Sequence, residues 1–148
     1  MSASPSPDYA GDLSVQETWS LLEKDPKAQL IDVRTVAEWN FVGLPDLSAL
    51  GRPVFRIEWQ SFPSMQPNAN FVADAMQALS SAGADTSTPV VFLCRSGARS
   101  RAAAMALTRA GYTQAFNIAD GFEGAVDAHG HRGATDGWKA AGLPWRQS

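Results

Sequence analysis

The residue with the most reactive side chain in this 148-residue sequence is Cys94, which is also its single cysteine. It follows the apolar run 89–93 and precedes Arg95, Gly97 and Arg99. A strand that ends in a cysteine, followed by a short glycine-containing loop and a helix, places the sulfur among backbone N–H groups at the positive end of that helix. The two arginines add positive charge, so the segment predicts a stabilised thiolate that acts as a nucleophile.

Several classes of function are excluded by composition. One cysteine cannot form an intramolecular disulfide or a metal site built on several thiolates. His129 and His131 lie in a glycine-rich segment without helical or strand spacing, which predicts a surface loop rather than a metal site. A net charge of −3 offers no global basic field for nucleic acid. No apolar run approaches the roughly 20 residues of a membrane span, and residues 1–11 lack the features of a signal peptide. We therefore expect a cytoplasmic protein without nucleic-acid or membrane partners.

The elements that must position the cysteine loop alternate between strands and helices. Short apolar runs predict strands over residues 29–33, 53–57, 89–93 and 113–118, whereas helical spacing and capping signals predict helices over 14–24, around 38–39, over 71–82 and over 100–110. This alternation predicts an α/β fold of three layers, with a central, mostly parallel sheet covered by helices on both faces. Ligands of such sheets bind beyond the C-terminal ends of the strands. The Ser/Pro-rich residues 1–11 predict a flexible leader ahead of one domain over 12–148.

The cysteine loop resembles a known family. Residues 94–100, Cys-Arg-Ser-Gly-Ala-Arg-Ser, resemble the active-site loop of single-domain rhodanese-like sulfurtransferases. Residues 32–34 with Glu38-Trp39 resemble the upstream signature of that family, and the segments 120–122, 137–138 and 142–144 resemble its C-terminal ending. One departure stands out, because Phe-Val-Gly-Leu-Pro at 41–45 replaces the His-Ile-Pro-Gly-Ala pattern usual after the upstream signature. We therefore expect the entrance to the site to differ.

The resemblance implies a rhodanese-like fold and a sulfurtransferase without a cofactor. The Cys94 thiolate would attack the outer sulfur of a small anionic donor such as thiosulfate, and the resulting persulfide would be removed by a thiol or cyanide. Since the chain has no second cysteine to resolve a persulfide, the acceptor must be an external thiol or a protein. The implied site consists of the nucleophile Cys94 and the substrate-binding residues Arg95, Ser96, Gly97, Ala98, Arg99 and Ser100.

Two other functions are open to a chain of this pattern. One is a non-catalytic rhodanese-like module that binds a partner, although such modules commonly lose the cysteine that this chain retains. The other is a cysteine-dependent phosphatase or arsenate reductase on the same fold. Phosphatases of that type place five residues between the cysteine and an arginine, whereas here Ser100 occupies that position. The shorter loop, ending at Arg99, favours a sulfur atom over a phosphate.

The remaining candidates have structural explanations. Asp32 and Arg34 at a strand end predict a structural ion pair rather than catalytic groups. Trp39 and Trp138 predict core packing, as is usual for aromatic side chains in a small domain. Trp59 lies in a polar, proline-rich stretch, so both a core position and a position beside the mouth of the site are open to it.

Overall fold

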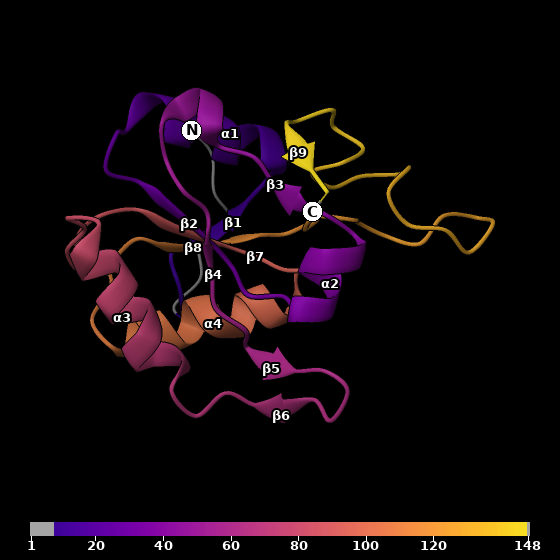
Figure 1. Cartoon of the computed structure of the whole chain (residues 1–148). Coiled ribbons are helices and arrows are strands. Elements are labelled where there is room, and N and C mark those ends of the chain that lie inside the picture. Colours follow the sequence, from indigo (N-terminus) through magenta and orange to yellow (C-terminus); the bar gives the residue numbers. More distant parts are fainter. Residues whose placement is uncertain (1–7, 148) are drawn as a thin grey trace.

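The computed structural model describes residues 8–147, and its centre is one five-stranded sheet (Figure 1). All neighbouring strands of this sheet are parallel. The order across the sheet is β1 (Gly11–Leu13), β8 (Ala115–Ile118), β7 (Val90–Leu93), β2 (Gln29–Asp32) and β4 (Phe55–Arg56). The predicted α/β architecture with a parallel sheet is confirmed.

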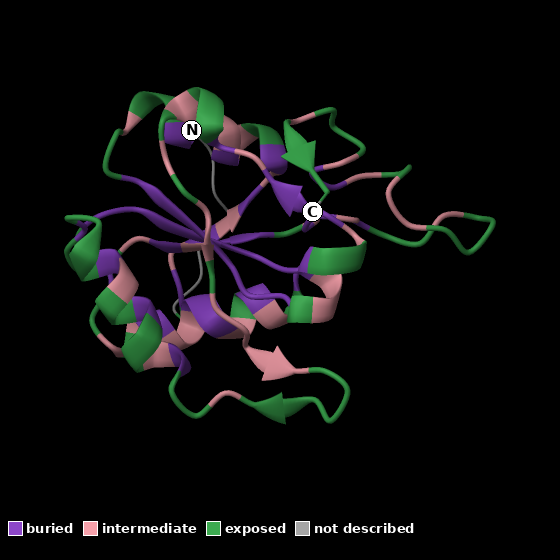
Figure 2. Ribbon diagram, in the orientation of Figure 1, coloured by how far each residue is buried: buried purple, intermediate pink, exposed green. Residues whose placement is uncertain are grey.

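Helices cover both faces of the sheet, which makes three layers (Figure 1). Helix α1 (Val15–Lys24) packs on one face, and α3 (Phe71–Ser81) and α4 (Ala98–Arg109) pack on the other. Alternate residues of each buried strand point to opposite faces, so β7 contributes side chains to both hydrophobic clusters. The central strands β2 and β7 are accordingly buried along their length, while the outer surfaces of the helices are exposed (Figure 2).

Capping boxes begin the first two helices, and the first of them was predicted from the sequence. Ser14 and Glu17 form a reciprocal capping box at α1, as their spacing predicted. Helix α2 (Val36–Phe41) begins in the same way with Thr35 and Glu38. None of the helices in the described residues 8–147 is both long and apolar enough to cross a membrane.

Short antiparallel ladders that the sequence did not predict flank the sheet. Strand β3 (Leu44–Pro45) pairs with β9 (Trp145–Arg146), and β5 (Gln60–Ser61) pairs with β6 (Gln66–Pro67). A 3₁₀ turn, η1 (Ser48–Leu50), follows β3. Ladders of two residues are too short to leave a period in the sequence.

The N-terminal part of the sheet begins earlier than the predicted domain. The predicted leader spans residues 1–11, of which 1–7 lie outside the described residues. Tyr9 is buried, the Ala10 amide donates to the Ala115 carbonyl at 2.9 Å, and Gly11 belongs to β1. The described end of the leader is therefore packed against β8 rather than extended away from the fold.

The topology explains where a ligand can bind. After β2 the chain leads outward to β4, whereas after β7 it leads outward to β8 on the other side. The C-terminal ends of β2 and β7 therefore flank a switch point, where the connecting segments diverge and leave a crevice. Cys94 directly follows β7 at this point.

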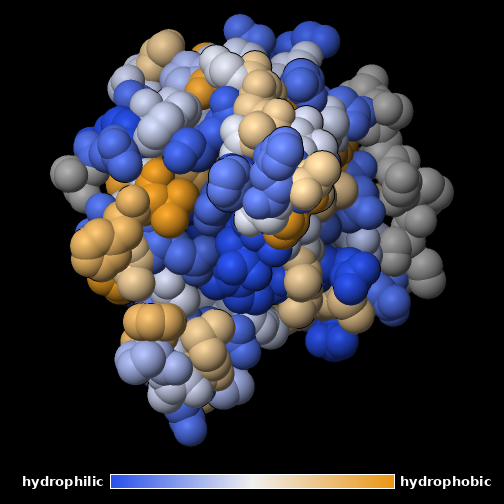
Figure 3. All heavy atoms as spheres, turned by 90° about the vertical axis from the view of Figure 1, so that its right-hand side faces the viewer, coloured by the Kyte–Doolittle hydropathy of each residue, from blue (hydrophilic) through white to orange (hydrophobic). Residues whose placement is uncertain are grey.

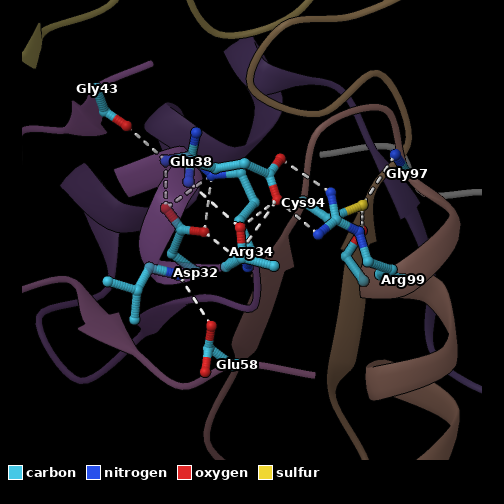
Figure 4. A network of polar contacts seen from close by, with 11 residues as sticks. Asp32, Arg34, Glu38, Gly43, Glu58, Cys94, Gly97 and Arg99 are labelled. Atoms are coloured by element: carbon cyan, nitrogen blue, oxygen red, sulfur yellow. Dashed lines mark hydrogen bonds and ion pairs between the residues drawn. The ribbon is translucent and has the colours of Figure 1, made fainter. Parts of the chain in front are cut away.

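The ion pair predicted at the end of β2 is present and buried. Arg34 Nη2 lies 2.7 Å from Asp32 Oδ2, and both side chains are fully buried. The same Nη2 donates to the Gly43 carbonyl at 2.7 Å, and the guanidinium lies 4.2 Å from the ring centroid of Phe122. Three parts of the chain are thereby joined beneath the switch point, and Figure 4 shows the contacts of Arg34 with Asp32 and Gly43. The prediction of a structural role is confirmed.

The tryptophans predicted to serve the core do so. Trp138 is fully buried in the cluster under α1, and Trp39 is buried beside β4. Trp59 forms an edge-to-face contact with Phe71, with ring centroids 5.0 Å apart. It packs against the core cluster under α3 and does not line the pocket that contains Cys94.

Removing one partner of the buried ion pair should destabilise the fold strongly. Asp32→Ala leaves the Arg34 charge buried without its carboxylate, so we expect the free energy of unfolding to fall by about 3–5 kcal/mol. Urea denaturation of both proteins measures this difference. The double variant Asp32→Ala/Arg34→Met removes both charges and should recover most of the loss, whereas equal stability of the single and double variants would contradict a buried charge penalty.

Candidate active site

Cys94 lies at the base of a pocket of about 1120 Å³ at the C-terminal edge of the sheet. Its side chain is only 1% exposed, yet it forms part of the pocket wall. The walls come from α2, from the β5–β6 hairpin, from the cysteine loop and from the segment after β8. A group must therefore enter the pocket to reach the sulfur.

The cysteine loop is braced from outside by the segment that follows β8. The amide of Phe122 donates to the Cys94 carbonyl at 2.8 Å, and the amides of Glu123 and Gly124 donate to the Arg95 carbonyl at 3.0 and 3.1 Å. These three bonds use the carbonyl groups of Cys94 and Arg95 and none of the amides of the loop.

Two glycines permit this close packing of backbones. Gly97 has a φ of 110°, and a Cβ at this position would lie 2.3 Å from the Ala119 carbonyl oxygen. A Cβ at Gly121 would lie 2.4 Å from the Arg95 carbonyl oxygen. Neither position can accept a side chain without displacing backbone, so both glycines are required by the curvature of the loop.

Most amides of the loop have no protein acceptor. The Gly97 amide donates to Cys94 Sγ at 3.1 Å (Figure 4). Within the described residues, no hydrogen bond is formed by the remaining amides of the loop and of the first turn of α4, those of Arg95, Ser96, Ala98, Arg99 and Ser100. Helix α4 begins at Ala98, two residues earlier than predicted, so its positive end lies directly at the sulfur. The arrangement is suited to an anion bound at or on Cys94.

Arg99 is held in an ion pair that the sequence did not predict. Its Nη1 and Nη2 donate to the two carboxylate oxygens of Glu38, at 2.7 and 3.0 Å. Burial alone would lower the pKa of Arg99, but the hydrogen bonds and charge of Glu38 outweigh burial and the pKa is raised. Burial likewise opposes ionisation of Glu38, and Arg99 outweighs it, so the pKa of Glu38 is lowered. The charge of Arg99 is therefore largely balanced by α2 (Figure 4).

Two arginines that form no ion pair with an acidic side chain within residues 8–147, Arg95 and Arg132, lie on the pocket wall. Arg95 is exposed, lines the pocket and forms no ion pair within residues 8–147. Arg132 and His131, from the segment after β8, also line it. The glycine-rich segment that contains His129 and His131 was predicted to be a surface loop. One of these histidines, His131, lines the pocket, and the spacing of the two did not indicate this position. Ser96 and Ala98 line the pocket as well.

The mouth of the pocket is bordered by exposed hydrophobic side chains. Phe41 is 81% exposed and Phe62 is 64% exposed, and Met65 and Val126 join them on the pocket wall. On the face of the molecule drawn in Figure 3, hydrophobic side chains gather beside a strongly hydrophilic centre. Phe41 begins the segment 41–45 that departs from the usual family pattern, and it lies at the mouth of the pocket. The other exposed large hydrophobic residues lie elsewhere, at Val36, Met76 and Trp145.

Comparison with known proteins places the chain in a family. The model of the STR4 middle domain family matches residues 10–148, which is nearly the whole chain. The chain belongs to the STR4 middle domain family. Relatives include an uncharacterised protein of Rickettsia conorii, 35% identical over 131 residues that cover 88% of this chain and 92% of the relative. Another, from Rickettsia prowazekii, is 35% identical over 130 residues with the same coverage.

Solved structures support the assignment of the fold. The crystal structure of Rv0390 from M. tuberculosis is 51% identical, covers 95% of this chain and 99% of its own, and superposes with a TM-score of 0.84. The solution structure of the polysulfide-sulfur transferase homodimer from Wolinella succinogenes is 25% identical, with coverage of 92% and 77% and a TM-score of 0.56. This member of the STR4 middle domain family therefore has the rhodanese-like fold that the sequence predicted.

Replacement of Glu38 should destabilise the protein in a pH-dependent manner. Glu38→Gln keeps the carbonyl oxygen of the cap but removes the charge that balances Arg99, so we expect a loss of about 1–3 kcal/mol at pH 7. Since folding lowers the pKa of Glu38 below its ordinary value of 4.5, its contribution is present above that value and is lost as the pH falls through the lowered one.

The difference between wild type and Glu38→Gln in urea denaturation should thus shrink on acidification below pH 4.5. The matched control is Glu23→Gln, an exposed carboxylate near the end of α1, which should change stability by less than about 0.5 kcal/mol. A Glu38→Gln difference that stays constant down to low pH would show that the carboxylate charge does not stabilise the fold.

Proposed function

We propose that this chain is a sulfurtransferase in which Cys94 carries a sulfane sulfur as a persulfide. The observation that carries the proposal is the position of Cys94 Sγ at the base of a pocket, with five neighbouring amides that have no protein acceptor. These amides and the N-terminus of α4 are suited to binding the anionic outer sulfur of a persulfide. The rhodanese-like fold agrees with this chemistry, although fold alone does not establish it.

The reaction runs in two displacements with no other redox partner. The Cys94 thiolate attacks the outer sulfur of a donor such as thiosulfate, the bond between the two donor sulfurs breaks, and sulfite leaves with the electron pair. The persulfide on Cys94 is then attacked at its outer sulfur by a thiolate or cyanide. This step releases a persulfide of the acceptor, or thiocyanate, and regenerates the Cys94 thiolate. Exposed Arg95 is placed to attract the anionic donor.

The ion pair of Arg99 favours this function over phosphate chemistry. A cysteine-dependent phosphatase needs a guanidinium free to bind the equatorial oxygens of a tetrahedral anion. Here both terminal nitrogens of Arg99 that face the pocket are engaged by Glu38. The backbone amides remain, and these suit a single sulfur atom. The open pocket above Cys94 also favours catalysis over a module that only binds a partner.

The pocket favours an acceptor larger than cyanide. A volume of about 1120 Å³ far exceeds what a diatomic anion fills, and its mouth presents Phe41 and Phe62. An organic thiol, free or on a protein, can bury apolar surface against these rings while its sulfur reaches Cys94. We take an organic thiol as the acceptor class.

Intact mass spectrometry tests the proposed persulfide directly. Wild type incubated with thiosulfate should gain the mass of one sulfur atom and lose it when cyanide is added, whereas Cys94→Ser should gain nothing. Circular dichroism checks that Cys94→Ser is folded. If wild type gains no sulfur from thiosulfate or from an organic persulfide, the chain is not a sulfurtransferase, and the partner-binding alternative takes its place.

The acceptor class is tested by removing the aromatic rim. Phe41→Ala/Phe62→Ala should raise KM for a hydrophobic thiol acceptor about three- to tenfold, since partial burial of the two rings together contributes on the order of 1 kcal/mol. Discharge by cyanide should be unchanged because cyanide does not reach the rings. Met76→Ala, an exposed residue of α3 away from the pocket, is the control. Equal effects on both acceptors would argue against recognition by the rim.

A further inference from the structure

The sulfur of Cys94 is the first member of a line of polar groups, buried at Ser100 and Asn117 and half-buried at Asp12, that runs across one face of the sheet. Cys94 Sγ lies 3.2 Å from Ser100 Oγ, which lies 2.5 Å from Asn117 Oδ1. On its other side, Asn117 Nδ2 donates to Asp12 Oδ1 at 3.0 Å. The hydroxyl of Tyr9 donates to the same carboxylate oxygen at 2.8 Å. Neither Asn117 nor Asp12 lines the pocket that holds Cys94.

Strand register produces this line. Strand β1 pairs with β8 so that Asp12 lies directly beside Asn117, and parallel register puts the two side chains on the same face of the sheet. Ser100 is the third residue of α4, which packs over that face. Ser100 is fully buried and Asn117 is 3% exposed, so water does not replace either partner.

The chemistry of each group fixes the direction of these bonds. The Asp12 carboxylate can only accept, so the amide of Asn117 must turn its NH₂ group toward Asp12. The carbonyl oxygen Oδ1 then faces Ser100 and can only accept from it. A serine hydroxyl has one proton, and two acceptors compete for it when Cys94 is a thiolate: Asn117 Oδ1 and the sulfur. The 2.5 Å separation makes the bond to Asn117 the shorter of the two.

We infer that Asn117, oriented by Asp12, withholds the Ser100 hydroxyl proton from the Cys94 sulfur and is thus a positioning residue for this nucleophile. A thiolate that receives less hydrogen bonding is less stabilised and intrinsically more nucleophilic. The inference deepens the proposed function by naming what tunes the sulfur, but its core concerns the protonation of Cys94 and can be tested without sulfur transfer.

Tyr9 closes the far end of the line. Burial, followed by the hydrogen bond and charge of Asp12, raises the pKa of Tyr9 to about 12. Tyr9 therefore stays protonated and remains a donor to Asp12 over the whole range in which a cysteine is titrated. The orientation of Asn117 is accordingly constant with pH, and only the Cys94 end of the line responds to titration.

Other charges face the two ends of the line and must be considered in any pH profile. Replacement of Asn117 by alanine leaves all of these charged groups in place, so a change in the midpoint between wild type and this variant does not come from them. Around the pocket these groups are Arg95, Arg99, Glu38, Glu123, His131 and Arg132, with the Asp32–Arg34 pair behind them. At the far end, Asp8 and Arg101 face Tyr9.

The experiment follows the pH dependence of alkylation of Cys94 by iodoacetamide, which reports on one site because the chain has one cysteine. In Asn117→Ala the hydroxyl of Ser100 is free to donate to the thiolate, so the midpoint should move to lower pH by roughly half to one unit. In Ser100→Ala the midpoint should stay near the wild-type value, because the proton that this variant removes is already engaged by Asn117 in the wild type. In the double variant, Asn117→Ala should have no effect beyond that of Ser100→Ala, since its action passes through the hydroxyl.

Conservative variants distinguish positioning from a general loss of structure. Ser100→Thr keeps the hydroxyl and should retain nearly the wild-type midpoint. Asp12→Asn allows the Asn117 amide to turn and should shift the midpoint in the direction of Asn117→Ala, which keeps the test decisive if Asn117→Ala does not fold. Thr18→Ala removes a buried hydroxyl on the opposite face of the sheet and should leave the midpoint unchanged.

Two results would overturn the inference. In the first, Asn117→Ala shifts the alkylation midpoint of Cys94 by the same amount whether or not the Ser100 hydroxyl is present. In the second, Asn117→Ala and Asp12→Asn both leave the alkylation midpoint in place or raise it. Because alkylation needs no sulfur donor, a protein that accepts no sulfur from thiosulfate or an organic persulfide would refute the proposed function while leaving this test valid.

Discussion

The curvature of the backbone around Cys94 is the constraint on which the rest of the site depends. It is maintained by amides of residues 122–124, which bind the carbonyls of Cys94 and Arg95. Within residues 8–147 it leaves the other loop amides without protein acceptors, apart from that of Gly97, which donates to Cys94 Sγ. Two chain segments approach so closely there that Gly97 and Gly121 cannot bear a Cβ. Because other bonds hold the curvature, these amide donors stay without protein acceptors. Under the proposed function, an anionic sulfur accepts hydrogen bonds from them.

Charged side chains near the loop amides form ion pairs that hold the surrounding elements together. An arginine close to a nucleophilic cysteine is easily assigned to substrate binding, but Arg99 forms a bidentate pair with Glu38 and fastens α2 to α4. Arg34 and Asp32 perform a similar task below the crevice. Both pairs stabilise the walls, and the donor nearest the sulfur, the amide of Gly97 at 3.1 Å, comes from the backbone. Backbone amides do not titrate, so their contribution to the field at the sulfur is constant over a wide range of pH.

Much of this architecture was predictable from local sequence. The capping pair Ser14–Glu17 indicated α1, and the branched apolar runs indicated the inner strands. The order of strand, cysteine loop and helix indicated the site. Strand β1 was not predicted, because Gly-Asp-Leu is too short to show a period and pairs with residues more than a hundred positions away. Asn117 was missed for the same reason. Its significance depends on register and on the position of Ser100 across the sheet, neither of which has a local signal.

Strand β1 is three residues long and hydrogen-bonds to only one neighbour, at the edge of the sheet. Edge segments of this size open at lower free energy than central strands, through fluctuations that leave the core intact. Each such opening withdraws Asp12 from Asn117 and releases the amide that it orients. The reactivity of a sulfur deep in the protein is then averaged over the motion of a peripheral segment, and anything that clamps or loosens the N-terminal edge changes the chemistry of Cys94 without approaching the pocket.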